Sequence, residues 1–439
     1  MAKRLPLAEH ATWRAPLRTH DPIDLLIESS KGRIEQLLPI RYGRMLTNPF
    51  AFYRGSAGIM AADLALTPST GVQLQACGDC HALNFGGFAT PERRIVFDIN
   101  DFDETSIAPW EWDVKRLVAS FVLLGRYRNF SREDTRECAW RAARGYRKRM
   151  AAYAEMPILE AWYDNFDLED LLDAVGEGEA LRKSKKKMEQ AAKATSHALE
   201  FEKLAIRSGP EPRIRDQPPL IYHLDHERGR HFRDDVAESF RRYKETVQPA
   251  VGTLLDRYRL VDVAMKVVGV GSVGTLCAMV LLMSGSGDPL FLQVKEARRS
   301  VLEPFAGESP VAHPGERVVR GQRLMQGASD MFLGWLVGAG KGHPNLYVRQ
   351  LSDVKIKPKV DIAVPSGTKV YARYTGMTLA RAHARSGDPV LLSAYIGQGE
   401  AFEDAMADFA LAYADQAERD HEAMVAAVRA GRIETQSET

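Results

Sequence analysis

Residues 77–84 read Cys-Gly-Asp-Cys-His-Ala-Leu-Asn, and an apolar run shortly afterwards ends in Val-Phe-Asp-Ile-Asn-Asp at 96–101. Short β-like stretches at 72–76 and 94–98 flank the first motif, so we expect them to pair as a hairpin. Paired strands lie only about 5 Å apart, which would bring a carboxylate of the second motif beside Asp79. The two motifs together predict a site rich in carboxylate and amide oxygens, the ligands of a hard metal ion.

These residue types suit phosphoryl transfer, which asks a protein mainly to position groups and to neutralise charge. Asp79 can orient the acceptor hydroxyl, and Asn84 can offer its amide oxygen to Mg²⁺. The second metal ligand is Asp98 or Asp101, because the Asp-Phe-Asp at 101–103 also imitates an Asp-Phe-Gly metal motif. We favour Asp98 from its position in the strand and its spacing.

A second set of features lies far downstream, where 269–274 read Gly-Val-Gly-Ser-Val-Gly and 291–295 read Phe-Leu-Gln-Val-Lys. A glycine loop between two strands can cover nucleotide phosphates, and a lysine on the third strand can anchor them. The loop also fits the dinucleotide-binding fingerprint of a Rossmann fold if 275–283 form a helix. The Gly/Ser turn at 284–289 favours strands and hence the first interpretation. The candidate phosphate-binding residues are Gly269, Gly271, Ser272, Gly274 and Lys295.

The two sets of motifs resemble the catalytic loop with its metal strand, and the glycine loop with its ATP-anchoring lysine, of aminoglycoside-phosphotransferase-like and protein-kinase-like enzymes. The loop of the aminoglycoside-phosphotransferase and choline-kinase group reads His-Gly-Asp-x-His-x-x-Asn, whereas this chain has Cys77 at the first position. His81 stands where eukaryotic-type protein kinases carry lysine, which favours a small-molecule acceptor. By the same resemblance, Asp113 opens the next helix and braces the catalytic loop. The resemblance implies ATP and Mg²⁺ as cofactors.

The order of these features is reversed, because the glycine loop and its lysine come first in such enzymes and last here. The helix expected at 375–385 resembles the one that normally leads into the catalytic loop. Cutting the chain there and joining the old ends gives the observed order, and chains tolerate permutation at surface sites. Most of the chain, including Asn-Pro-Phe-Ala-Phe-Tyr-Arg-Gly at 48–55, also resembles an uncharacterised bacterial domain-of-unknown-function family with kinase-like motifs.

We therefore expect an α+β, bilobal, protein-kinase-like (aminoglycoside-phosphotransferase-like) fold, circularly permuted, with a helix-rich large lobe. The expected division is an N-terminal extension (1–69), the first part of the large catalytic lobe (70–246), the small ATP-binding lobe (247–360), C-terminal helices that complete the large lobe (361–432) and a disordered tail (433–439).

The composition excludes several classes of partner. The chain has 439 residues, of which 45% are hydrophobic and 27% charged, and a formal net charge of +1, so no global field favours nucleic acid or an anionic membrane. No stretch reaches the roughly 18 apolar residues of a membrane helix. The first 16 residues lack an apolar signal core, so we expect a cytoplasmic protein.

The expected function is ATP- and Mg²⁺-dependent phosphotransfer to a hydroxyl of a small-molecule acceptor, with a protein as the alternative acceptor. Kinases pair the lysine with a glutamate on the following helix. The helix expected at 317–336 has no clear partner for Lys295, and Glu303 is another candidate. That gap leaves open a nucleotide-binding pseudokinase with a regulatory role, while a Rossmann oxidoreductase using NAD(P) is the second alternative. Arg54 is either a structural loop arginine or a ligand for an anionic substrate.

Overall fold

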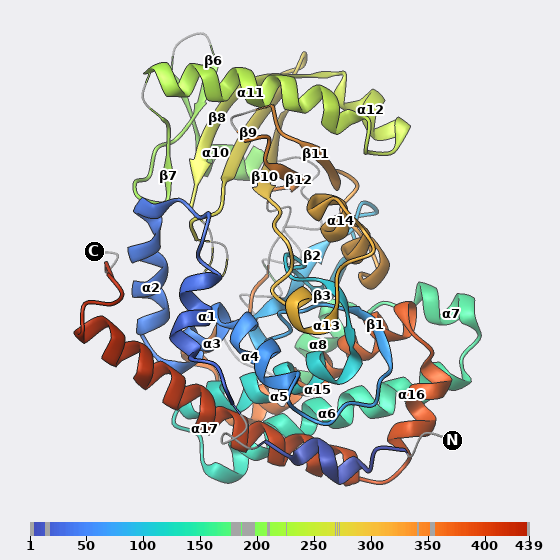
Figure 1. Ribbon diagram of the computed structural model, residues 1–439. Coiled ribbons are helices and arrows are strands. Elements are labelled where there is room, and N and C mark those ends of the chain that lie inside the picture. The colour runs from blue at the N-terminus through green and yellow to red at the C-terminus, as the bar shows by residue number, and fades with distance from the viewer. Residues whose placement is uncertain are drawn as a thin grey trace.

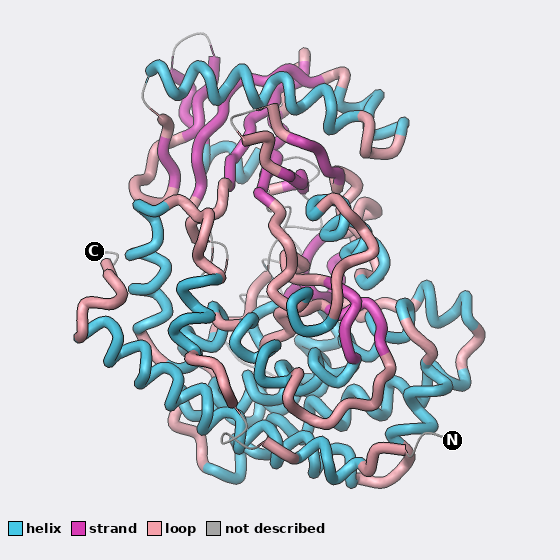
Figure 2. Tube along the Cα trace, viewed as in Figure 1, coloured by secondary structure: helices cyan, strands magenta, loops and turns pink. Residues whose placement is uncertain are grey.

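The computed structural model describes residues 4–13, 18–176, 186, 198–208, 211–224, 226–267, 269, 271, 273–339, 342–351 and 356–436. The fold is mixed α+β, as expected. Figure 1 shows an upper lobe built around a sheet, which α11 crosses, and a lower lobe in which helices predominate. Figure 2 shows the same division, with most strands gathered in the upper lobe. Within the described ranges, every helix is too short or too polar to span a lipid bilayer.

The upper lobe contains a six-stranded antiparallel sheet in the order β11–β12–β10–β9–β8–β7. Residues 277–284 are apolar almost throughout because both faces of this central strand are buried. Ala278, Val280 and Leu282 pack in one cluster, while the intervening methionines and leucine pack in another with Phe201. The strands are β7 (Ile221–Tyr222), β8 (Tyr258–Lys266), β9 (Cys277–Ser284), β10 (Pro289–Glu296), β11 (Gly334–Val337) and β12 (Asn345–Gln350).

This topology excludes the Rossmann interpretation of the glycine loop. That interpretation needs a crossover helix after the loop, but β9 follows it and pairs antiparallel with both β8 and β10. The Gly/Ser-rich turn then reverses the chain, and Ser284 N donates to the Asp288 carbonyl at 3.0 Å. The loop therefore joins two neighbouring strands of one antiparallel sheet.

Helices cover the upper sheet and extend this lobe upstream of residue 247, since β7 and α11 both precede that position. The helix expected at 317–336 ends at Met325, residues 326–333 are irregular, and β11 begins at Gly334. Gly327 and the Asp330 turn that follow Met325 interrupt the helical pattern. The helices are α10 (Ala198–Leu204), α11 (His226–Lys244), α12 (Pro249–Leu255) and α14 (Pro314–Met325), and a small hairpin pairs β5 (Ala205–Ser208) with β6 (Glu211–Ile214). The short helix α13 (Glu303–Ala306) packs against the core of the lower lobe.

The lower lobe has a helical core around α5 (Trp110–Tyr127), in which every residue from 110 to 125 is buried. Gly376 allows α6 and α15 to touch, because a Cβ at that position would lie 1.9 Å from the Ala142 carbonyl oxygen. The remaining helices of this lobe are α6 (Arg132–Glu155), α7 (Ile158–Tyr163), α8 (Leu168–Val175), α15 (Pro365–Ser386), α16 (Pro389–Ile396) and α17 (Ala401–Arg429).

The strands around the first motif pair differently from our expectation. β1 pairs with β4, and β3 pairs with β2, so the predicted hairpin between 72–76 and 94–98 is wrong. The physical reason is that residues 85–89 form a strand of their own, which takes the next strand along the chain as its partner. The bounds are β1 (Gln73–Ala76), β2 (Phe85–Ala89), β3 (Ile95–Ile99) and β4 (Ser106–Pro109).

The N-terminal segment packs against the glycine loop and is part of the folded body. Of its helices, α2 lies at the side of the molecule between the two lobes, and α1, α3 and α4 lie in the lower lobe (Figure 1). Ile34 N donates to the Gly274 carbonyl at 2.6 Å, and the Arg33 guanidinium donates to the carbonyls of Gly271 and Val273. The helices are α1 (Pro22–Glu28), α2 (Leu38–Leu46), α3 (Pro49–Gly55) and α4 (Ala57–Leu64), with short 3₁₀ turns at Leu7–Ala11, Glu35–Leu37, Ala82–Asn84 and Val360–Ile362.

Candidate functional site

A cavity of about 1160 Å³ lies between the lobes and brings the two sets of motifs together. They are about 190 residues apart in sequence, yet Lys295 Nζ lies 2.6 Å from Asp103 Oδ2. The lower lobe lines the cavity with Asp79, His81, Asn84 and Asp101, and the upper lobe lines it with Gly269, Gly271 and Lys295.

The loop that carries Asp79 is held from below by Asp113 at the start of α5. The Asp113 carboxylate accepts hydrogen bonds from the backbone N–H groups of Cys77 at 2.6 Å and Gly78 at 2.9 Å. His383 Nε2 on α15 lies 3.2 Å from the same carboxylate. This is the bracing contact that the resemblance implies for Asp113.

Gly78 is required at its position for two reasons. Its φ is +86°, and a Cβ there would lie 2.2 Å from the Glu104 carbonyl oxygen. We expect Gly78→Ala to lower the free energy of unfolding by about 1–2 kcal/mol through the left-handed backbone alone, with a further loss from the clash. Gly71→Ala is the matched control, since φ is +76° there and no atom lies within 4 Å of the added Cβ. Equal losses for both variants in urea unfolding would contradict a steric constraint at Gly78.

Asp79 is oriented by Arg116, which lies one helical turn after Asp113. Arg116 donates to Asp79 Oδ1 from Nε at 2.8 Å and from Nη2 at 2.5 Å, and its guanidinium stacks over the Tyr53 ring. His81 Nε2 lies 3.8 Å from Asp79 Oδ2. Burial lowers the pKa of His81 to about 3, and Nδ1 accepts the Leu83 N–H, so the ring is neutral with its proton on Nε2.

Asn84 joins the two lower motifs. Its Nδ2 donates to the backbone carbonyls of Asp79 at 3.1 Å and of Asp101 at 2.9 Å. None of the described residues donates to its Oδ1. The Asp101 side chain is 46% exposed and lines the cavity, with Oδ1 3.8 Å from Lys295 Nζ. Asp101 Oδ1 also accepts the Asp103 N–H at 3.3 Å, so Asn84 Oδ1 and Asp101 Oδ2 are the oxygen atoms of these two cavity-lining side chains that accept no hydrogen bond from the described residues.

Asp98 is placed differently from our expectation. It is 1% exposed and is absent from the lining of the cavity. Its Oδ1 accepts from Arg381 at 2.5 Å, and its Oδ2 accepts from Gly327 N at 2.9 Å. The preference for Asp98 over Asp101 does not agree with this placement, because both carboxylate oxygens of Asp98 already bind protein groups.

Lys295 lies on β10 and is 1% exposed. Asp103 is its closest acidic partner among the described residues, and Tyr347 donates from its hydroxyl to the other oxygen of Asp103. Burial opposes the charge on Lys295, but Asp101 and Asp103 outweigh it and raise the pKa of this lysine. Glu303 pairs instead with Arg299. The carboxylate that pairs with Lys295 therefore lies on the loop after β3, whereas we expected a glutamate on a helix.

The glycine loop borders the cavity with its backbone. Among the described residues, a Cβ on Gly269 would meet no atom within 4 Å, and one on Gly271 would meet only the Arg54 carbonyl oxygen at 3.8 Å. Gly274 has a φ of +87°, which favours glycine. Ser272, also predicted to bind phosphate, lies outside the described residues. The open space beside Gly269 and Gly271 would let a ligand approach the backbone.

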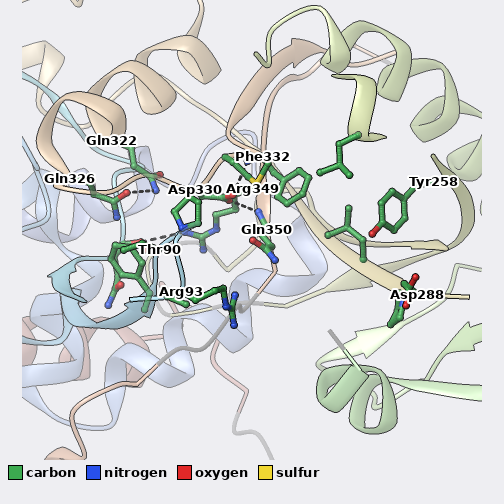
Figure 3. A pocket seen from close by; sticks show the side chains of 18 residues that line it. Thr90, Arg93, Tyr258, Asp288, Gln322, Gln326, Asp330, Phe332, Arg349 and Gln350 are labelled. Carbon is green, nitrogen blue, oxygen red and sulfur yellow. Dashed lines mark hydrogen bonds between the residues drawn. The ribbon is translucent and has the colours of Figure 1, made fainter. Parts of the chain in front are cut away.

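A second pocket, of about 300 Å³, shares Arg349 and Asn100 with the lining of the large cavity (Figure 3). Arg349 donates to the side chain of Gln293 and to the Asn100 carbonyl, and so ties the upper sheet to the segment after β3. None of the predicted site residues is among the described residues that line this pocket. Asn100, which does line it, is only the neighbour of Asp101 in sequence. The predicted chemistry therefore belongs to the larger cavity.

Sequence reasoning missed Arg116, Asp103 and Arg349. The spacing of three residues between Asp113 and Arg116 was a usable signal, because such residues lie on one face of a helix. Asp103 stands in the third position of the Asp-Phe-Asp motif, where the metal motif has glycine. Nothing local marks Arg349, whose contacts come from distant segments.

The family model for an "Uncharacterized protein conserved in bacteria (DUF2252)" matches residues 33–427. The comparisons with curated proteins and with solved structures found no match. The description of the family states no activity, so function is argued from the geometry of the cavity.

Proposed function

We propose that this chain, which belongs to the DUF2252 family of uncharacterized proteins conserved in bacteria, is an ATP- and Mg²⁺-dependent phosphotransferase with a circularly permuted protein-kinase-like fold. One observation carries the proposal. Asp79, Asn84, Asp101, Lys295 and the glycine loop line a single cavity, although they come from distant parts of the chain. These are the groups that phosphoryl transfer requires.

The donors fit a magnesium–nucleotide complex better than a metal ion alone. The described residues contain no group of three or more acidic, histidine or cysteine side chains that could hold a metal. Magnesium is commonly held by one or two carboxylates together with substrate phosphates. Asn84 Oδ1 and the Asp101 carboxylate would hold it, and the bound ion would neutralise charge on the transferred phosphoryl group.

The upper lobe would hold the nucleotide phosphates. The backbone of the glycine loop can approach them closely, since Gly269 and Gly271 face open space. Lys295 supplies a buried cation, and Asp103 fixes its position in the way that a helix glutamate does in protein kinases.

Asp79 would orient the acceptor hydroxyl. Arg116 holds Oδ1, while no described residue within hydrogen-bond distance occupies Oδ2. The neutral His81 ring lies beside that free oxygen. Asp79 can therefore accept the hydrogen bond of an acceptor hydroxyl and take its proton as the new bond to phosphorus forms.

The position of α15 supports the circular permutation. Ser386 Oγ, in the last residue of α15, donates to the Gln75 carbonyl of β1 at 3.4 Å. The helix that resembles the one leading into the catalytic loop thus ends beside the strand that leads into Cys77. A chain cut at this point and joined elsewhere would keep these contacts.

The test is product formation from labelled ATP. Protein incubated with Mg²⁺ and either α- or γ-labelled ATP, together with a panel of hydroxyl compounds, should form ADP and move only the γ label to an acceptor. Transfer of the α label would indicate AMP transfer on the same scaffold. ATP that stays intact with every acceptor would contradict the proposal.

A nucleotide-binding regulator is the second candidate, and one observation favours it. Asp79 and Lys295 are each already ion-paired within the protein, to Arg116 and Asp103. Such a protein would bind ATP without turning it over. Stoichiometric recovery of unchanged ATP after binding would support this candidate.

A further inference from the structure

Three arginines of the N-terminal segment converge beside Asp79. They line a small cavity of about 40 Å³, to which Asp79, Glu104 and Gly271 also contribute. Asp79, Gly271 and Arg54 line the large cavity too, so the two spaces adjoin. The cluster consists of Arg33 in the segment after α1, Arg41 on α2 and Arg54 near the end of α3.

None of these arginines forms an ion pair with an acidic side chain in the part of the chain that the structure describes. Arg33 donates to the backbone carbonyls of Gly271 at 2.8 Å and Val273 at 2.7 Å. Arg41, only 2% exposed, donates to the Ser30 hydroxyl and the Gly55 carbonyl, each at 3.0 Å. Its Nε is buried without a hydrogen bond, and so is Arg54 Nε.

The neighbouring acids Glu104 and Asp79 attract these arginines, but for each arginine burial outweighs that attraction and lowers its pKa. Arg116 already binds the Asp79 carboxylate, burial raises the pKa of Glu104, and Glu104 Oε2 accepts the Val301 N–H at 2.8 Å. The pKa of Arg41 is lowered to about 9, mainly by burial and to a smaller extent by repulsion from Arg33. Buried cations without partners are costly, and a bound anion would relieve that cost.

We propose that the arginine cluster of Arg33, Arg41 and Arg54 binds an anionic group, a phosphate or a carboxylate, of the acceptor molecule. This inference rests on the proposed phosphotransfer. The cluster lies on the acceptor side, because Asp79 lines the small cavity whereas Asn84, Asp101 and Lys295 do not. The space admits about three water-sized spheres, which suits an oxyanion but not a ring, so the rest of the acceptor extends into the large cavity.

The test measures anion binding without nucleotide. Wild-type protein is titrated by calorimetry with inorganic phosphate and, separately, with acetate. We expect saturable binding that Arg54→Gln and Arg41→Gln each weaken at least tenfold. Arg44→Gln is the matched control, since Arg44 lies on the same helix as Arg41 but lines neither cavity, and it should leave the affinity unchanged. If Arg41→Gln fails to fold by circular dichroism, Arg54→Gln decides the matter alone.

The two anions distinguish the source of the charge. Binding of phosphate alone indicates a phosphorylated acceptor, and binding of acetate as well extends the class to carboxylates. Absence of saturable binding by either anion overturns the inference, as does phosphate binding that Mg²⁺–ATP displaces competitively, since the arginines would then serve the nucleotide.

ADP formation is scored separately. Its presence without anion binding refutes the arginine site alone, whereas anion binding without ADP formation under any condition refutes the acceptor role and the phosphotransferase together.

Discussion

Replacement of Asp101 by asparagine is expected to abolish Mg²⁺-dependent ATP binding and to lower ADP formation by about a thousandfold. The Asp101 side chain lines the cavity, 3.8 Å from Lys295 Nζ, and its 46% exposure leaves it accessible to a metal ion. Metal ions supply several kcal/mol of charge stabilisation in a transition state. About 4 kcal/mol corresponds to the thousandfold loss. The measurement is ADP formation as a function of Mg²⁺ concentration, beside binding of a fluorescent ATP analogue.

The control for this result is Asp98→Ala, which tests whether Asp98 is the metal ligand in place of Asp101. The Asp98 carboxylate pairs with Arg381, whose Nε and Nη1 make no hydrogen bond in the described structure. Removing one partner of a buried ion pair costs about 3–5 kcal/mol, so this variant should unfold at a lower urea concentration. Below its unfolding transition it should keep the Mg²⁺ dependence of the wild type. The reverse pattern, with Mg²⁺ dependence lost in Asp98→Ala and kept in Asp101→Asn, would restore Asp98 as the ligand.

Replacement of Asp79 by asparagine is expected to lower phosphoryl transfer by about 10²–10⁴-fold, the usual contribution of a general base. ATP binding should stay within about twofold of the wild type, because Asp79 faces the acceptor. The measurement is single-turnover transfer of the γ label together with the dissociation constant for Mg²⁺–ATP.

Arg116→Lys provides the control for orientation at Asp79. Lysine keeps the charge but loses the two-point contact of Arg116 with Oδ1. A smaller loss of rate than in Asp79→Asn, again without loss of ATP affinity, would agree with a positioning role. Unchanged transfer in Asp79→Asn would remove this residue from the mechanism.

The features that sequence predicted best are local ones. The strands on either side of the glycine loop depend on residues that are close in the chain. The Asp113 brace joins residues 36 positions apart and was predicted from the family resemblance. The Gly/Ser turn after Ser284 favoured strand over helix, because it allows the tight reversal that joins neighbouring antiparallel strands.

The features that sequence could not predict depend on distant partners. β3 is buried on both faces, so its residues show no alternation that would separate Asp98 from a cavity-facing carboxylate. Arg381, which satisfies Asp98, lies 283 residues away. The docking of Arg33 and Ile34 on the glycine loop likewise joins segments about 240 residues apart. Local periodicity carries no information about such contacts.

The most direct measurement is calorimetric titration of the wild-type protein with ATP, in the presence and absence of Mg²⁺, with NAD titrated alongside. We predict binding of one ATP per chain that depends on Mg²⁺, and no binding of NAD. An absence of ATP binding in the presence of Mg²⁺ would contradict the assignment of the cavity to a nucleotide and with it the phosphotransferase proposal.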